Sequence, residues 1–178
     1  MPQAVTHFLI PLILLGLFQD FIVKNKKTFP IHYVFIGGLA GLIPDLDIAI
    51  YYLLSFFGFT IQEVHRTFSH NLFVPLLFVL LGFAFWNFKA KGLGKHHLKL
   101  RIIFFVMAFG IFTHLLLDAI ISGMIMPFYP FSNFAIGLNL ISLFPLPWQN
   151  TIIPTLDAIL LIFWMIYIEV KHKISDFI

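Results

Sequence analysis

The sequence has no cysteine and few charged residues. Of its 178 residues, 11% are charged and 60% are hydrophobic, whereas a soluble domain carries about 25% charged residues. Without cysteine, disulfides and thiolate metal ligands are excluded. No basic stripe interleaved with aromatic residues is present, so we expect no nucleic-acid partner. The mean hydropathy of +0.97 instead indicates an integral membrane protein.

Hydropathy divides the chain into about five candidate spans, each near the length that crosses a bilayer. They lie at residues 4–23, 30–44, 71–88, 102–121 and 152–170. We therefore predict one all-α domain over residues 1–178, a membrane helical bundle with short interfacial or re-entrant helices. The first span lacks a basic n-region and a cleavage site, so we expect a retained helix rather than a signal peptide.

Two further apolar stretches do not read as spans. Ile48–Phe59 is short and aromatic, which favours an interfacial or re-entrant helix. Residues 124–146 contain several prolines, which exclude one continuous helix. We expect this second stretch to form a folded cap at the membrane surface.

The basic residues indicate the orientation. Of the 11 lysines and arginines, all but Arg66 follow span one, join spans three and four, or follow span five. With five spans these positions share one face, and the positive-inside rule makes that face cytoplasmic. We predict a multi-pass protein of the inner (plasma) membrane, with its N-terminus outside and its C-terminus in the cytoplasm.

Four spans place a histidine or aspartate at one depth. His7, Asp45, His70 and Asp118 each lie 17 to 19 residues from the basic residue at the far end of their own span. At about 1.5 Å per residue this separation is roughly 26–29 Å, close to the ~30 Å thickness of the hydrocarbon layer. We therefore expect these side chains to converge at the outer boundary.

The second and fourth spans end in acidic motifs. His114 and Asp118 are four residues apart and share one helix face. That spacing suits two ligands of one metal ion or a carboxylate that orients a ligating imidazole, and a structural hydrogen bond is the alternative. Pro44 precedes Asp45 and Asp47, at least one of which we interpret as a ligand, while one could cap the next helix.

The densest polar stretch is His65-Arg66-Thr67-Phe68-Ser69-His70, at the start of the third span. Polar groups beside an apolar segment are costly unless they are bound. Arg66 is poorly placed for the helix dipole, so we expect an anionic partner such as a carboxylate, a phosphate or a lipid headgroup. His7 is either a ligand or an interfacial residue, and Asp157, inside span five, supports the site or bonds to another helix.

These motifs together resemble a known family. An early His7, the run Gly41-Leu42-Ile43-Pro44-Asp45-Leu46-Asp47, the stretch from His65 to His70, and His114-Leu115-Leu116-Leu117-Asp118 occur in this order. They resemble a LexA-regulated family of bacterial inner-membrane proteins that are predicted to be metal-dependent hydrolases. The family usually has Thr-His-Ser at the end of its His-Arg motif, where this chain has Ser69-His70-Asn71. A more distant similarity to zinc-dependent phospholipase C implies phosphoester cleavage at a multi-metal cluster.

We therefore predict a membrane-embedded hydrolase that cleaves a phosphoester in a lipid or lipid-linked substrate. The expected cofactor is one to three divalent ions, Zn²⁺ first and Mn²⁺ or Fe²⁺ next, because the donors are imidazoles and carboxylates. The predicted ligands are His7, Asp45, Asp47, His65, His70, His114 and Asp118. The predicted catalytic residues are Asp47, as a base if it is not a ligand, Arg66, which stabilises negative charge, and Ser69.

A non-catalytic membrane protein is the alternative, either a metal or proton carrier or a structural scaffold. Carriers place their polar groups near the bilayer midplane and on broken helices. Here all of these groups except Asp157 lie at one boundary, which favours hydrolysis over transport. A scaffold would bind no metal.

Overall fold

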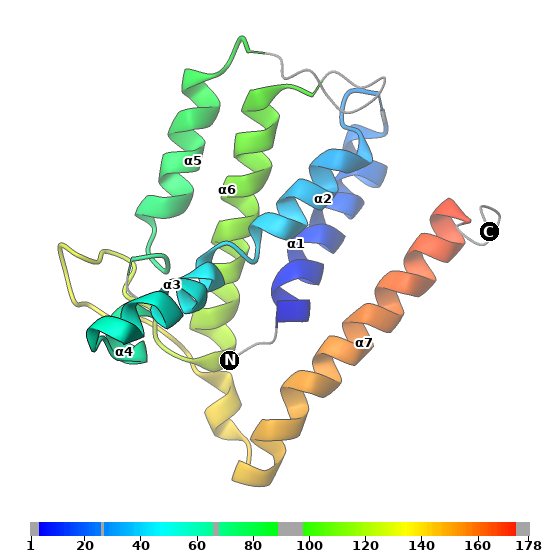
Figure 1. Ribbon diagram of the computed structural model, residues 1–178. Helices are drawn as coiled ribbons and strands as arrows, with labels where there is room; N and C mark the ends of the chain where they lie inside the picture. The colour runs from blue at the N-terminus through cyan, green and yellow to red at the C-terminus, as the bar shows by residue number, and fades with distance from the viewer. Residues whose placement is uncertain (1–3, 26, 66–67, 89–97, 174–178) are drawn as a thin grey trace.

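The computed structural model describes residues 4–25, 27–65, 68–88 and 98–173, and most of these residues are helical (Figure 1). The longer helices are α1 (Ala4–Leu17), α2 (Ile31–Ala40), α5 (Phe73–Ala84), α6 (Leu100–Leu117) and α7 (Leu146–His172). Single π-helical turns extend α1 over Phe18–Val23 and α6 over Asp118–Ser122. Two short helices, α3 (Asp47–Leu54) and α4 (Ile61–Val64), follow α2. Along the chain the five longer helices alternate in direction, so the ends of α2 and α6 lie near the start of α1.

Helices α1, α2 and α6 form the centre of the bundle and pack unusually closely. A Cβ atom on Gly41 would lie 2.1 Å from the carbonyl oxygen of His7, and one on Gly110 would lie 2.2 Å from that of Gly37. Membrane helices commonly meet at such small residues, where no side chain holds the backbones apart. Larger apolar side chains such as Leu12 fill the rest of this core.

Helix α5 packs against α6, whereas α7 leans away from the bundle and touches it mainly along α1 (Figure 1). Two polar contacts hold α7 in place: the Thr6 hydroxyl donates to Asp157, and the Tyr167 hydroxyl donates to Asp20. Of the two roles expected for Asp157, the bond to another helix is therefore the one that forms. Most of the remaining surface of α7 is apolar and exposed.

The described residues contain three helices long and apolar enough to cross a membrane: Ala4–Val23, Leu100–Ile121 and Leu146–Lys171. Ile31–Ala40 and Pro44–Phe57 form a fourth span only if the pair, bent by 46°, is counted as one. Helix α5 has 12 residues, which at about 1.5 Å per residue falls well short of the hydrocarbon thickness. The membrane helical bundle is thus confirmed, and the predicted count of about five spans is not.

The two shorter apolar stretches fold as their prolines and length indicate. A 3₁₀ turn at Pro44–Leu46 ends the α2 region and starts α3, which continues into a 3₁₀ turn at Ser55–Phe57. Between α6 and α7 no continuous helix forms, as predicted. Instead Ile125 pairs with Ile136 in an isolated antiparallel bridge, and a 3₁₀ turn spans Leu140–Leu143. These pieces surround the end of the bundle where α1 begins (Figure 1).

Candidate metal centre

Histidines and aspartates from four parts of the chain meet at the end of the bundle where α1 begins. His7 comes from α1, Asp45 from the turn after α2, His70 from the segment before α5, and Asp118 from the end of α6. His7, His70, His114 and Asp118 are almost completely buried. The convergence expected from their shared depth is therefore present in the fold.

Two imidazole nitrogens and two carboxylate oxygens lie close together at the centre. The Nε2 atoms of His70 and His114 are 3.1 Å apart. The Nε2 atom of His70 lies 3.4 Å from Asp118 Oδ2 and 3.7 Å from Asp45 Oδ1. The Nε2 atom of His114 lies 3.8 and 3.6 Å from the same two oxygens. Around a tetrahedral zinc ion with bonds of about 2.0–2.2 Å, neighbouring donor atoms are about 3.4 Å apart. These distances therefore suit donors that share one small cation.

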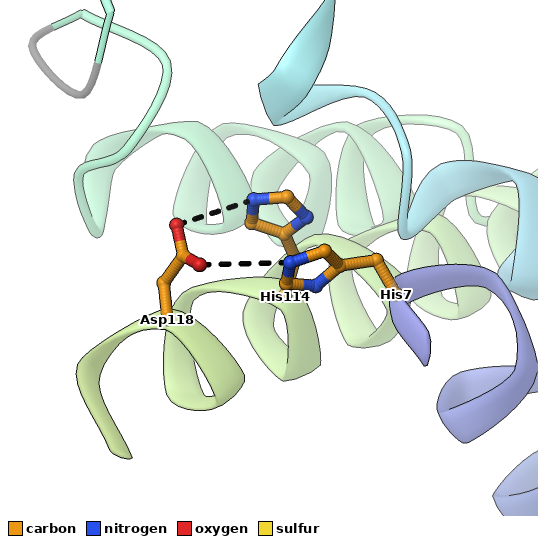
Figure 2. A group of neighbouring side chains, drawn as sticks. All are labelled: His7, His114 and Asp118. Carbon is orange, nitrogen blue, oxygen red and sulfur yellow. Dashed lines mark ion pairs between the residues drawn. The ribbon is translucent and has the colours of Figure 1, made fainter. Parts of the chain in front are cut away.

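His7 completes a second group with His114 and Asp118, shown in Figure 2. Its Nε2 atom lies 3.5 Å from Asp118 Oδ1, and its ring stacks on that of His114 with 3.8 Å between centroids. Asp118 thus turns one oxygen toward His7 and the other toward His70 and His114. A carboxylate in that position can bind one ion with both oxygens or bridge two ions.

Asp47 contacts the Nδ1 atoms of His65 and His70. Its Oδ1 is 2.8 Å from His65 Nδ1, and its Oδ2 is 3.2 Å from His70 Nδ1. The Ser69 hydroxyl donates to Oδ2 at 2.6 Å and lies 2.9 Å from His70 Nδ1. A carboxylate that accepts an Nδ1–H fixes the imidazole tautomer whose Nε2 lone pair is free to bind a metal. The contacts of Asp47 are those of an orienting group.

Backbone atoms orient His114 in the same way. Its Nδ1 is 2.7 Å from the carbonyl oxygen of Gly41, so it donates there and Nε2 keeps its lone pair toward the centre.

The Nε2 atom of His65 is buried and has no hydrogen-bond partner among the described residues. His65, Asp45 and His70 form the other group whose ligand atoms lie within 4.8 Å of one another. A buried imidazole nitrogen with a free lone pair fits a metal ligand.

The carboxylates give the site a strongly negative electrostatic environment. Burial disfavours the charged form of His70, but the carboxylates of Asp118, Asp45 and Asp47 outweigh this effect and raise its pKa to about 10. With three carboxylates around it, the centre favours a positive charge. A divalent ion would supply that charge, and the imidazole and carboxylate donors suit zinc, manganese or iron.

A comparison with protein-family models identifies the family of the chain. Residues 1–174 match the model of the YdjM inner membrane protein family. The chain belongs to this family. The match confirms the LexA-regulated family that the motifs resembled and, with the apolar helices, supports a location in the inner membrane. The family description states no activity, and no curated protein and no solved structure matches the chain.

The structure brings together all seven predicted ligands, although Asp47 contacts the imidazoles rather than the centre. Ser69 lies beside Asp47 and His70, and Arg66 lies outside the described residues. Sequence reasoning missed the Gly41 carbonyl, because no side chain marks a backbone acceptor. Among the ligands, Asp45 has the most exposed side chain, at 24%, compared with 9% for His65 and less for the others. Asp45 therefore marks the side from which the centre can be reached.

Proposed function

We propose that this YdjM family member is a metal-dependent hydrolase that cleaves a phosphoester in a lipid or lipid-linked substrate. The observation that carries the proposal is the central group of His70, His114, Asp45 and Asp118, whose donor atoms lie 3.1 to 3.8 Å apart. Four convergent donors from three separate parts of the chain exceed what helix packing needs. A buried group of this kind inside a membrane protein is expensive to maintain without a role.

The residues of the site divide into metal ligands, residues that orient the ligands, and a residue that would neutralise charge on the substrate. His7, His65, His70, His114, Asp45 and Asp118 would hold one or more ions, zinc being favoured. An ion bound there would polarise a phosphoryl oxygen and lower the pKa of water toward about 7. Asp47 and Ser69 keep His65 and His70 in the ligating tautomer. Arg66, which lies outside the described residues, would neutralise charge on the phosphate.

The position of the site in the membrane supports a lipid substrate. The central residues lie near the outer boundary if the basic residues Lys24 and Lys99 mark the cytoplasmic side. With the odd number of spans that the sequence predicts, the N-terminus is outside in that orientation, and the site is level with lipid headgroups. A phosphate at that level can reach the side of the centre that Asp45 leaves open.

The test is hydrolysis of phospholipid vesicles by the purified protein, with and without a chelator. We expect release of the phosphorylated headgroup, its loss after chelation, and its recovery when zinc or manganese is added back. The Asp118→Asn variant should be inactive. Asp20→Asn, the same change in the π-helical turn after α1 and away from the centre, should retain activity. Hydrolysis that survives chelation would reject a metal-dependent reaction, and the absence of hydrolysis from metal-loaded protein would favour the carrier or scaffold.

A further inference from the structure

His70 stands at the middle of the candidate centre but is not part of a helix. Its Nε2 atom lies 3.1 Å from that of His114 and 3.4 Å from Asp118 Oδ2, and its side chain is completely buried. His7 and His114 lie within α1 and α6, whereas His70 lies in a bent segment before α5. A functional side chain on an irregular segment is placed less precisely than one on a helix, unless neighbouring groups fix the backbone. The position of His70 therefore depends on what holds that segment.

The side chain of Asn71 joins the chain on the two sides of His70. Its Nδ2 donates to the carbonyl oxygen of Phe68 at 2.7 Å. Its Oδ1 accepts from the backbone N–H groups of Phe73 at 3.0 Å and Val74 at 3.2 Å, the first two residues of α5, as an N-capping side chain does. Asn71 is only 5% exposed, so water would not readily replace these bonds if they were lost.

We propose that Asn71 is a positioning residue of the metal centre, whose amide clamps the segment from Phe68 to Val74 and thereby fixes His70. The inference rests on the proposed function, because it takes His70 as a metal ligand. Asp47 and Ser69 contact the ring of His70, whereas Asn71 holds the backbone that carries it. An amide suits this role, since one end donates and the other accepts. The bond to Phe68 lies outside α5, and it distinguishes the clamp from a helix cap that would stabilise α5 alone.

Chemical modification of the metal-free protein tests the clamp independently of activity. Diethyl pyrocarbonate acylates accessible imidazoles, and mass spectrometry of the peptides reports each histidine separately. We expect Asn71→Ala to make His70 react about fivefold faster or more, the factor that corresponds to the loss of an asparagine cap. His32, in the first turn of α2, is the reference and should react as in the parent. Unchanged reactivity of His70, or an equal rise for both histidines as in general unfolding, would overturn the proposal.

Zinc affinity connects the clamp to the centre. Asn71→Ala should raise the zinc dissociation constant about tenfold or more, with the number of ions bound at saturation unchanged. Asn71→Ser is similar in size to Asn71→Ala but can still accept from the α5 amides, so it should recover part of the affinity and of the protection of His70. A serine variant no better than alanine would show that a void, and not the lost hydrogen bonds, releases His70, and it would contradict the clamp. Asn25→Ala is the matched control, because Asn25 Oδ1 accepts from the Lys27 N–H at 3.0 Å in the turn between α1 and α2, and its zinc affinity should equal that of the parent.

Zinc binding and His70 reactivity together separate the clamp from the proposed function. A parent that binds no zinc, while His70 still becomes reactive in Asn71→Ala, would reject the proposed function and leave Asn71 as the residue that fixes His70. Unchanged zinc affinity in Asn71→Ala, with metal-dependent hydrolysis intact, would reject the positioning role and leave the proposed function.

Discussion

The Asp47→Asn variant gives the sharpest test of how the candidate centre is organised. The native carboxylate lies against the Nδ1 atoms of both His65 and His70 and accepts from Ser69. Asparagine keeps the size of the side chain, but it removes the negative charge and replaces one acceptor oxygen with an NH₂ group that cannot accept a hydrogen bond. One of the two imidazoles therefore loses the partner that fixes its tautomer.

The expected magnitude follows from what such orienting groups contribute elsewhere. Loss of a partner that orients a metal-bound histidine costs about 10- to 100-fold in metal affinity, or about 1.4 to 2.8 kcal/mol. For Asp47 we expect a value toward the upper end, because one carboxylate serves two histidines. The zinc dissociation constant should rise by that factor while the number of zinc ions bound at saturation stays the same.

A competition titration against a zinc-binding fluorescent chelator measures this dissociation constant in detergent. Asp20→Asn is the matched control, because Asp20 lies in the π-helical turn after α1, away from the centre, and bonds to Tyr167. An unchanged affinity in Asp47→Asn would refute the orienting role. A lower number of bound ions at saturation would instead make Asp47 a direct ligand, as the sequence alone allowed.

Further predictions concern the packing that positions the site. Gly41→Ala should lower the melting temperature and the metal content together, because its Cβ would press on the backbone of His7 at a cost of about 1–3 kcal/mol. Gly16→Ala is the control in thermal melts and should match the parent, because its Cβ would make only ordinary contacts, 3.5 Å from the Trp164 ring and 4.0 Å from Val34. Thr6→Val removes the hydrogen bond to Asp157 and should destabilise the protein by about 0.6 kcal/mol, the average for such bonds in membranes; an unchanged melting temperature would show that this bond does not stabilise α7. Chelation should lower the melting temperature of the parent and not that of Asp118→Asn, and equal shifts would argue against a structural contribution of the metal.

The sequence predicted the convergence of the histidines and aspartates better than it predicted the number of membrane-spanning helices. Depth counting worked for His7, His70 and Asp118 because it depends only on the rise of a helix and on the basic residues that mark the other end of each span. Composition likewise identified the prolines that break the segment between α6 and α7.

Span lengths could not be read as reliably. Hydropathy measures how apolar a stretch is, and it treats the turns at the two ends of α5 as part of the helix. The role of Asp47 could not be decided from the sequence either, since a ligating carboxylate and an orienting carboxylate leave the same sequence pattern. Only the contacts with the Nδ1 atoms of His65 and His70 distinguish the two roles.

Elemental analysis by mass spectrometry on the purified protein tests the central claim most directly. The sample is compared with a His70→Ala, His114→Ala double variant, which lacks the two imidazoles whose Nε2 atoms face each other at 3.1 Å. We predict stoichiometric zinc, manganese or iron in the parent and its loss in the folded double variant. A parent that holds no stoichiometric metal, even after these ions are added back, would contradict the account.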